Sequence, residues 1–174
     1  MKIKVSDFIA SFLEGKGVTH VFELSGGMIT HLLDSFYLKT KVRIITMHHE
    51  QAAAFAADAY GRVTRIPGVA LATSGPGATN LITGIASCYF DSSPAIFITG
   101  QVNISELKGD RSIRQLGFQE TDIVTMANVI TKKSYAVKKA SDIPNIMEEA
   151  FALATSGRPG PVLIDICLLY TSDA

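Results

Sequence analysis

The sequence has 174 residues, of which 47% are hydrophobic, and its formal net charge is zero. That length fits one domain, and the hydrophobic fraction is high enough to fill a core between layers of secondary structure. Because the charge is balanced and no basic tract is present, we expect neither nucleic acid nor a membrane as a partner. The apolar stretches are shorter than the roughly 20 residues that a membrane-spanning helix needs.

The two cysteines and the first residues indicate a reducing compartment. Cys88 and Cys167 each lie in a mostly apolar run and do not form a Cys-x-x-Cys pair. We therefore expect buried free thiols rather than a disulfide or a metal site. Residues 1–7 become acidic and amphipathic at once, which is not typical of a signal peptide. A cytoplasmic location is the expectation.

Helical and strand patterns alternate along the chain. The first helix is expected at residues 6–16, with Ser6 as its N-cap and Gly15 or Gly17 at its end. Further helices are expected from the Gly26–Gly27 turn to residue 37 and at 49–65, 77–89, 121–128 and 142–155. Strands are expected at 18–24, 43–47, 69–73, 95–99, 133–137 and 161–166.

This order of elements predicts the fold class. Short, uninterrupted apolar strands separated by helices indicate a three-layer α/β/α fold with a mostly parallel central sheet. We expect one domain at residues 1–166, followed by a truncated or non-native tail at 167–174, which ends without an evident cap. The polar segment 101–117 is longer than most connections, which makes it a candidate functional loop.

Glu50 is the first candidate for chemistry. It begins an alanine-rich helix directly after a predicted strand. Acidic residues are common in first helical turns because they complement the helix dipole, so a purely structural role is the alternative. In a parallel sheet, however, ligands bind outside the carboxyl ends of the strands, and Glu50 lies just past one of these ends.

The glycine-rich segment 72–80 is the second candidate, because it also follows a strand and opens a helix. Glycines at such a turn let the backbone approach a flat or anionic ligand closely. The segment does not match a Rossmann fingerprint, since Pro76 interrupts it, Asn80 takes the place of the last glycine, and three strands precede it. Segment 118–122 is a third candidate, with a simple helix cap as its alternative.

Considered together, these segments resemble the acetolactate synthase family of thiamine-diphosphate-dependent enzymes. The strings that match are HEQAA at 49–53, ATSGPGATN at 72–80, ITGQV at 98–102, FQE at 118–120 and SGRPGPVLIDI at 156–166. Their order and spacing are similar to those of the family's N-terminal, pyrimidine-binding domain. The resemblance covers about residues 3–166, and ATSGPGATN followed by ITGQV is its most specific part.

The resemblance implies a role for particular residues. Glu50 matches the family's catalytic glutamate, whose carboxyl group shares a proton with the pyrimidine ring nitrogen and so activates the cofactor. Cofactor-binding positions are implied for Glu50 and for Gly26, Thr73, Ser74, Pro76, Gly77 and Asn80. Phe118 and Gln119 match residues that approach the substrate.

The resemblance also implies what this chain lacks. Family members have three domains, and thiamine diphosphate lies between the first domain of one subunit and the third of another. A Gly-Asp-Gly…Asn motif in the third domain holds Mg²⁺, whereas Gly109-Asp110 is followed here by Arg111, so no metal ligand is predicted in this chain. The implied partners are the middle and C-terminal domains, a homo-oligomer and a 2-keto acid such as pyruvate, and FAD use stays open.

Two departures from the family pattern lie on the substrate side. The family usually has Tyr-Pro-Gly-Gly where this chain has Leu24-Ser25-Gly26-Gly27, and the loop before Phe118 is longer here. A 2-keto acid decarboxylase or oxidase on the same scaffold is therefore kept as an alternative to acetolactate-type carboligation, as is a non-catalytic, nucleotide-binding α/β module. For His31, His48 and His49 we expect structural or surface roles.

Overall fold

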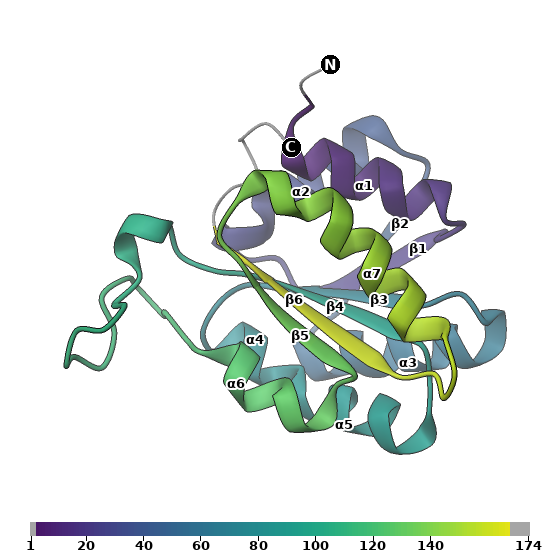
Figure 1. The fold of residues 1–174 in the computed structure, drawn as a ribbon. Coiled ribbons are helices and arrows are strands. Elements are labelled where there is room, and N and C mark those ends of the chain that lie inside the picture. The colour runs from purple at the N-terminus through teal and green to yellow at the C-terminus, as the bar shows by residue number, and fades with distance from the viewer. Residues whose placement is uncertain (1–2, 168–174) are drawn as a thin grey trace.

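In the computed structural model, which describes residues 3–167, six parallel strands form one sheet (Figure 1). The strand order is β2-β1-β3-β4-β6-β5, and every neighbouring pair is parallel. The strands are β1 (His20–Glu23), β2 (Arg43–Thr46), β3 (Gly68–Ala72), β4 (Ala95–Gly100), β5 (Lys133–Val137) and β6 (Pro161–Ile166). The predicted parallel sheet is confirmed.

Helices cover both faces of this sheet (Figure 1). One face carries α1 (Val5–Gly15), α2 (Thr30–Lys39) and α7 (Ile143–Thr155). The other carries α3 (Glu50–Thr64), α4 (Pro76–Asn80), α5 (Ile82–Asp91) and α6 (Ile123–Ala127). Short 3₁₀ turns occur at Gly27–Ile29, Ile104–Glu106, Asn128–Ile130 and Ala140–Asp142. The three-layer architecture agrees with the prediction.

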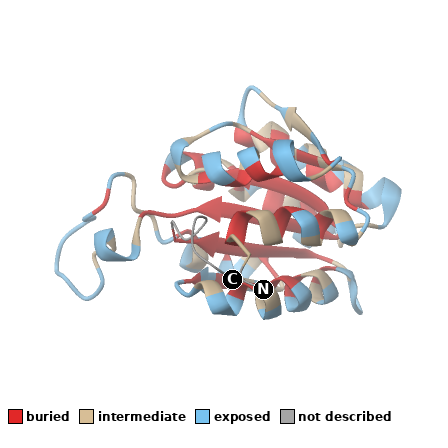
Figure 2. Cartoon of the chain, turned by 90° about the horizontal axis from the view of Figure 1, so that it is seen from above, coloured by how far each residue is buried: buried red, intermediate tan, exposed pale blue. Residues whose placement is uncertain are grey.

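Each face of the sheet has its own hydrophobic core. Side chains alternate between faces along a strand, so in β3 Val69 and Leu71 join the core under α1, α2 and α7, whereas Ala70 and Ala72 join the core under α3. The central strands β3, β4 and β6 are buried at every residue, and the edge strand β2 is not (Figure 2). Burial on both faces explains why the central strands are almost continuously apolar.

Helix α3 lies unusually close to its neighbours because small residues line the contact. A Cβ atom added to Gly84 of α5 would overlap the Cβ of Ala54, and one added to Gly68 would overlap the carbonyl oxygen of Ala57. A Cβ on Gly61 would likewise overlap the carbonyl oxygen of Pro94. The glycines therefore set the position of α3 against β3 and α5, and with it the position of the first turn of α3.

Two local predictions are wrong. Helix α1 begins at Val5, and Ser6 is not its N-cap: the Ser6 side chain is buried, and its Oγ accepts a hydrogen bond from Ser35 Oγ at 2.8 Å. The helix expected at 77–89 is two helices, α4 and α5. The chain tightens between them, where the Leu81 N–H donates to the carbonyl of Ala78 at 3.1 Å.

Other expectations agree with the structure to within a few residues. His49 caps α3, and its Nδ1 accepts from the Gln51 N–H at 3.1 Å, which is the structural role expected of it. Cys88 and Cys167 are free and buried. Of the expected tail at 167–174, residues 168–174 lie outside the described residues. None of the described helices is long and apolar enough to cross a membrane.

The contact between α3 and α5 generates a stability prediction. Alanine normally stabilises a helix by about 1 kcal/mol relative to glycine. Gly84→Ala should instead destabilise the protein by about 1–3 kcal/mol, because the new methyl group has no space beside Ala54. Urea unfolding followed by circular dichroism measures this. Gly15→Ala is the matched control, since a Cβ there meets nothing within 4 Å and should cost nothing. Equal effects of the two substitutions would contradict tight α3–α5 packing.

Candidate functional site

The candidate site lies where the sheet changes its winding direction. From β1 the chain passes through α2 to β2 on one side, and from β2 it passes through α3 to β3 on the other side of β1. The connection after β1, through α2, and the connection after β3, through α4 and α5, lie on opposite faces of the sheet, and ligands of open parallel sheets bind at such switch points. Gly26 follows β1 and Thr73 follows β3, and a Cβ on Gly26 would overlap the Thr73 side chain.

Glu50 lies at this edge, at the first position of α3. Its residue is 7% exposed, and its Oε2 accepts a hydrogen bond from Asn80 Nδ2 at 2.9 Å. No group within residues 3–167 donates a hydrogen bond to its second oxygen, Oε1. A Cβ on Gly77 would be 3.2 Å from this Oε1, so α4 presents bare backbone to the carboxyl group. The structure therefore brings Glu50, Gly77 and Asn80 together.

The turn between β3 and α4 completes this group. Gly75 has a φ of 65°, which L side chains rarely adopt. Thr73 Oγ1 accepts from the Met28 N–H at 3.3 Å, which joins the turn to the segment after β1. Ser74 is buried, and Pro76 is the first residue of α4. Gly26, Thr73, Ser74, Pro76 and Gly77 thus belong to one continuous surface.

The two predicted substrate residues differ in their placement. Gln119 has a φ of 59°, and a Cβ on Gly75 would be 2.6 Å from the Gln119 Cβ. Gln119 therefore packs against the glycine turn of the Glu50 group. Phe118 is 76% exposed, so its ring is not held in the protein interior. Gln119 thus lies against the glycine turn, whereas the Phe118 ring lies on the surface of the described residues.

Sequence reasoning missed two buried acids at the same edge. Glu23, at the end of β1, is 1% exposed and accepts hydrogen bonds from Thr46 Oγ1 at 2.5 Å and Ser25 Oγ at 3.0 Å. Asp165, in β6, accepts from Thr99 Oγ1 at 2.6 Å and Gln101 Nε2 at 3.1 Å. A carboxylate inside an otherwise apolar strand is the signal in the sequence that could have identified both residues.

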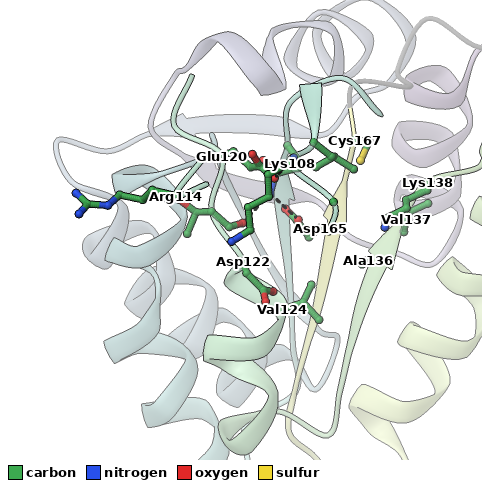
Figure 3. Close-up of a pocket in the computed structure, with 14 residues that line it drawn as sticks. Lys108, Arg114, Glu120, Asp122, Val124, Ala136, Val137, Lys138, Asp165 and Cys167 are labelled. Atoms are coloured by element: carbon green, nitrogen blue, oxygen red, sulfur yellow. Dashed lines mark hydrogen bonds between the residues drawn. The ribbon is translucent and has the colours of Figure 1, made fainter. Parts of the chain in front are cut away.

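Asp165 lies at the wall of a cavity of about 300 Å³ beside the ends of β4, β5 and β6 (Figure 3). Lys108, Glu120 and Asp122 also line it, and the Arg114 side chain points away from Asp165 in that view. Burial raises the pKa of Asp165 to about 6, although its two hydrogen bonds oppose the rise and the charge of Asp122 adds to it. Glu50 does not line this cavity, so the two acids mark separate parts of one edge.

Within residues 3–167, no group of three or more histidine, cysteine, aspartate or glutamate side chains is arranged to hold a metal ion. The Glu50 group can therefore offer a carboxyl oxygen, an amide and bare glycine backbone, but not metal coordination. These groups suit a flat, neutral, hydrogen-bonding ring that can lie against glycine backbone.

Comparisons with known proteins agree with this geometry. The family model for the thiamine pyrophosphate enzyme, N-terminal TPP binding domain, matches residues 3–126. The chain is 47% identical over 163 residues to acetolactate synthase 2, chloroplastic, of Nicotiana tabacum, which covers 94% of the chain and 24% of the relative. It is 49% identical over 157 residues to acetolactate synthase of Arthrospira platensis, covering 88% and 26%. With mitochondrial acetolactate synthase of Schizosaccharomyces pombe it shares 47% identity over 149 residues, covering 86% and 21%. The chain thus spans about a quarter of the length of these relatives.

The buried acid Asp165 generates a prediction about pH. An Asp whose pKa is about 6 when folded and about 3.8 when unfolded binds more protons in the folded protein between these values. Its contribution to stability is therefore present below about pH 4 and is lost as the pH rises to about 6. Asp165→Asn removes this dependence, so the stability of the wild type relative to the variant should fall by about 2 kcal/mol over that range.

Chemical denaturation of both proteins at pH 4, 5, 6 and 7 measures the difference. Acids that do not interact with Asp165 titrate alike in the two proteins and cancel. A stability difference that stays constant from pH 4 to pH 7 would contradict the raised pKa of Asp165.

Proposed function

Because the chain belongs to the thiamine pyrophosphate enzyme family, as its N-terminal TPP-binding domain, we propose that it forms the half of a thiamine diphosphate site that holds the pyrimidine ring. The observation that supports this most directly is the Glu50 carboxyl group. It is nearly buried at the switch point of the sheet. Asn80 donates a hydrogen bond to Oε2, and none of the described residues donates one to Oε1. A ring nitrogen that shares a proton with Oε1 would complete this arrangement.

The surface around Glu50 fits a flat ring. Gly26 and Gly77 each lack the Cβ atom that would overlap or crowd Thr73, so the backbone itself forms the wall. Gly75 allows the turn that carries this backbone past the carboxyl group. Thr73, Ser74 and Pro76 set the course of the turn. The residues present therefore suit the pyrimidine, and they offer nothing for a diphosphate.

Glu50 would act by holding a proton at the pyrimidine ring nitrogen. When bound, thiamine diphosphate supplies a thiazolium ring that can hold the electron pair left when a 2-keto acid loses carbon dioxide. Asn80 donates to Oε2 and leaves Oε1 as the proton-sharing oxygen. Glu50 is only 7% exposed, and a ring bound against Oε1 would displace the water that competes for this proton. Glu50 is thus proposed as the catalytic residue, and Asn80 as the residue that orients it.

The substrate side is proposed to be formed by Gln119 and Phe118. Gln119 packs against the glycine turn, and the exposed ring of Phe118 is free to contact other parts of the protein. A 2-keto acid such as pyruvate, used in acetolactate-type carboligation, is the proposed substrate. The differences at Leu24-Ser25 and in the longer loop before Phe118 keep a decarboxylase or oxidase as the second candidate.

The remainder of the site is proposed to come from other domains. The relatives are about four times as long as this chain, so they have room for domains that hold Mg²⁺ and the diphosphate. A homo-oligomer and a cytoplasmic location stay predictions. One of the relatives is named as chloroplastic and another as mitochondrial. FAD use stays open in the same way.

The catalytic proposal is tested by Glu50→Gln in the full-length protein that carries this domain. The substitution keeps the size of the side chain but removes the group that shares a proton. Hydrogen–deuterium exchange at C2 of bound thiamine diphosphate, followed by NMR, should slow by about 100-fold or more. The melting temperature should change little, because a first-turn charge contributes only about 0.3–1 kcal/mol.

Asp7→Asn is the matched control, since it removes the first-turn charge of a different helix, α1. It should leave the C2 exchange unchanged. If Glu50→Gln lowers the melting temperature while the exchange rate stays at the wild-type value, Glu50 serves the helix and not the cofactor.

A second prediction concerns the 174-residue chain by itself. Most of the charge of thiamine diphosphate lies on its diphosphate, for which the described residues provide no metal site. The chain should therefore bind the cofactor weakly, with a Kd of about 1 mM or more, and Mg²⁺ should not improve binding. Isothermal titration calorimetry with and without Mg²⁺ measures this, and tight Mg²⁺-dependent binding would contradict the half-site proposal.

A further inference from the structure

The connection between β4 and α6, here called the β4–α6 loop (residues 101–122), projects away from the body of the domain (Figure 1). Most of it is exposed, in contrast to the strands it follows (Figure 2). Yet it carries Gln119, which adopts a left-handed backbone conformation against Gly75. A side chain holds such a conformation only where surrounding contacts impose it. Contacts with the buried part of the domain therefore hold the C-terminal end of the loop, which carries Gln119.

Gln101, at the start of the loop, supplies that contact. It is 5% exposed, and its amide uses every polar atom: Oε1 accepts from the Val102 N–H at 3.0 Å, and Nε2 donates to the carbonyl oxygen of Thr121 at 2.7 Å and to Asp165 Oδ2 at 3.1 Å. The first residue of the loop is thus bonded to its last turn. Thr121 Oγ1 in turn donates to the carbonyl of Gln119 at 3.3 Å.

Three partners fix the orientation of the Gln101 amide, and Asp165 is the only side chain among them. A carboxylate oxygen accepts hydrogen bonds, so it selects the orientation in which Nε2 faces it. In that orientation the second N–H of Nε2 reaches Thr121. If the amide turned around, an oxygen would face the carbonyl of Thr121, and this bond would be lost. Asp165 is 66 residues away from Thr99, its other donor, so the pairing exists only because β4 and β6 are neighbours.

A second set of contacts holds the middle of the loop independently of Asp165. The Glu120 carboxylate accepts from the backbone N–H groups of Lys108 and Leu116, both at 2.8 Å. These bonds close the projecting part of the loop on itself. They do not connect it to the sheet, whereas the bond from Gln101 to Thr121 does. The position of Gln119 relative to Gly75 therefore depends on the Gln101 contact.

We propose that Asp165 and Gln101 are positioning residues, which hold Gln119 against the Gly75 turn beside Glu50 and thereby set the substrate side of the site. The proposal rests on the proposed function, because it assigns Gln119 to the substrate. Neither positioning residue touches the reacting atoms. Their effect passes through the hydrogen bond to Thr121 and the packing of Gln119 on Gly75.

The first test uses the 174-residue chain and does not depend on any activity. Asp165→Leu removes the acceptor that Gln101 Nε2 bonds, so one N–H of the buried amide loses its partner, the amide shifts and its bond to Thr121 weakens. Hydrogen–deuterium exchange with mass spectrometry should show the backbone of residues 117–122 exchanging at least about 10-fold faster. Thr99→Val is the matched control: it removes the other hydrogen bond to Asp165 without facing Gln101, and the same segment should exchange at the wild-type rate. Unchanged exchange in Asp165→Leu, or equal acceleration in both variants, overturns the proposal.

The second test uses the full-length protein that carries this domain. Asp165→Leu should raise the KM for pyruvate about 10-fold and change kcat less than 3-fold, with C2 exchange of the cofactor unaltered because Glu50 and Asn80 are untouched. Faster loop exchange together with an unchanged KM would overturn the link from Gln119 to the substrate. The proposed function fails separately, through normal C2 exchange in Glu50→Gln.

Discussion

The structure depends above all on the close packing of α3 between β3 and α5. Gly68 and Gly84 leave no room for a side chain where they meet Ala57 and Ala54, so α3 cannot shift without losing contact on both sides. A helix held this closely has a defined first turn, and that turn carries Glu50. The alanine-rich sequence of α3 thus serves the site as well as the core, because any larger residue at the contact would move the carboxyl group.

The parallel sheet places the first turn of α3 at the same edge as the ends of the strands. All six strands in the described residues end on the same side, so segments far apart in the sequence meet there. The switch point between β1 and β3 collects Glu50, the glycine turn and Asn80. The ends of β4 and β6 collect Gln101 and Asp165. Gln119 joins the two groups, since its loop is bonded to the second group while its side chain packs against the first.

The proposed half-site is consistent with two features of the described residues. The described residues surround one side of the Glu50 carboxyl group, and the cavity of about 300 Å³ lies elsewhere on the edge. Large apolar side chains, among them Phe55, Phe90 and Phe118, are exposed. Exposed apolar side chains that form a contiguous patch are typical of surfaces that contact other protein, whereas single ones are common on any surface. Relatives that are about four times as long contain further protein that such surfaces could contact.

The sequence by itself determined the fold class, the order of elements and the candidate residues of the site. The signals used, which are hydrophobic periodicity, helix-start residues and turn residues, act between near neighbours in the chain. Glu50, the turn at 72–80 and the long loop were candidates on these local signals, and the roles proposed for them came from the resemblance to a known family. Only the tertiary structure decided where Ser6 lies, that Leu81 divides two helices, and that Glu23 and Asp165 are buried with partners. The bonds from Thr46 to Glu23 and from Thr99 to Asp165 join residues 23 and 66 positions apart. Such contacts follow from the order of strands in the sheet, which local sequence patterns do not encode.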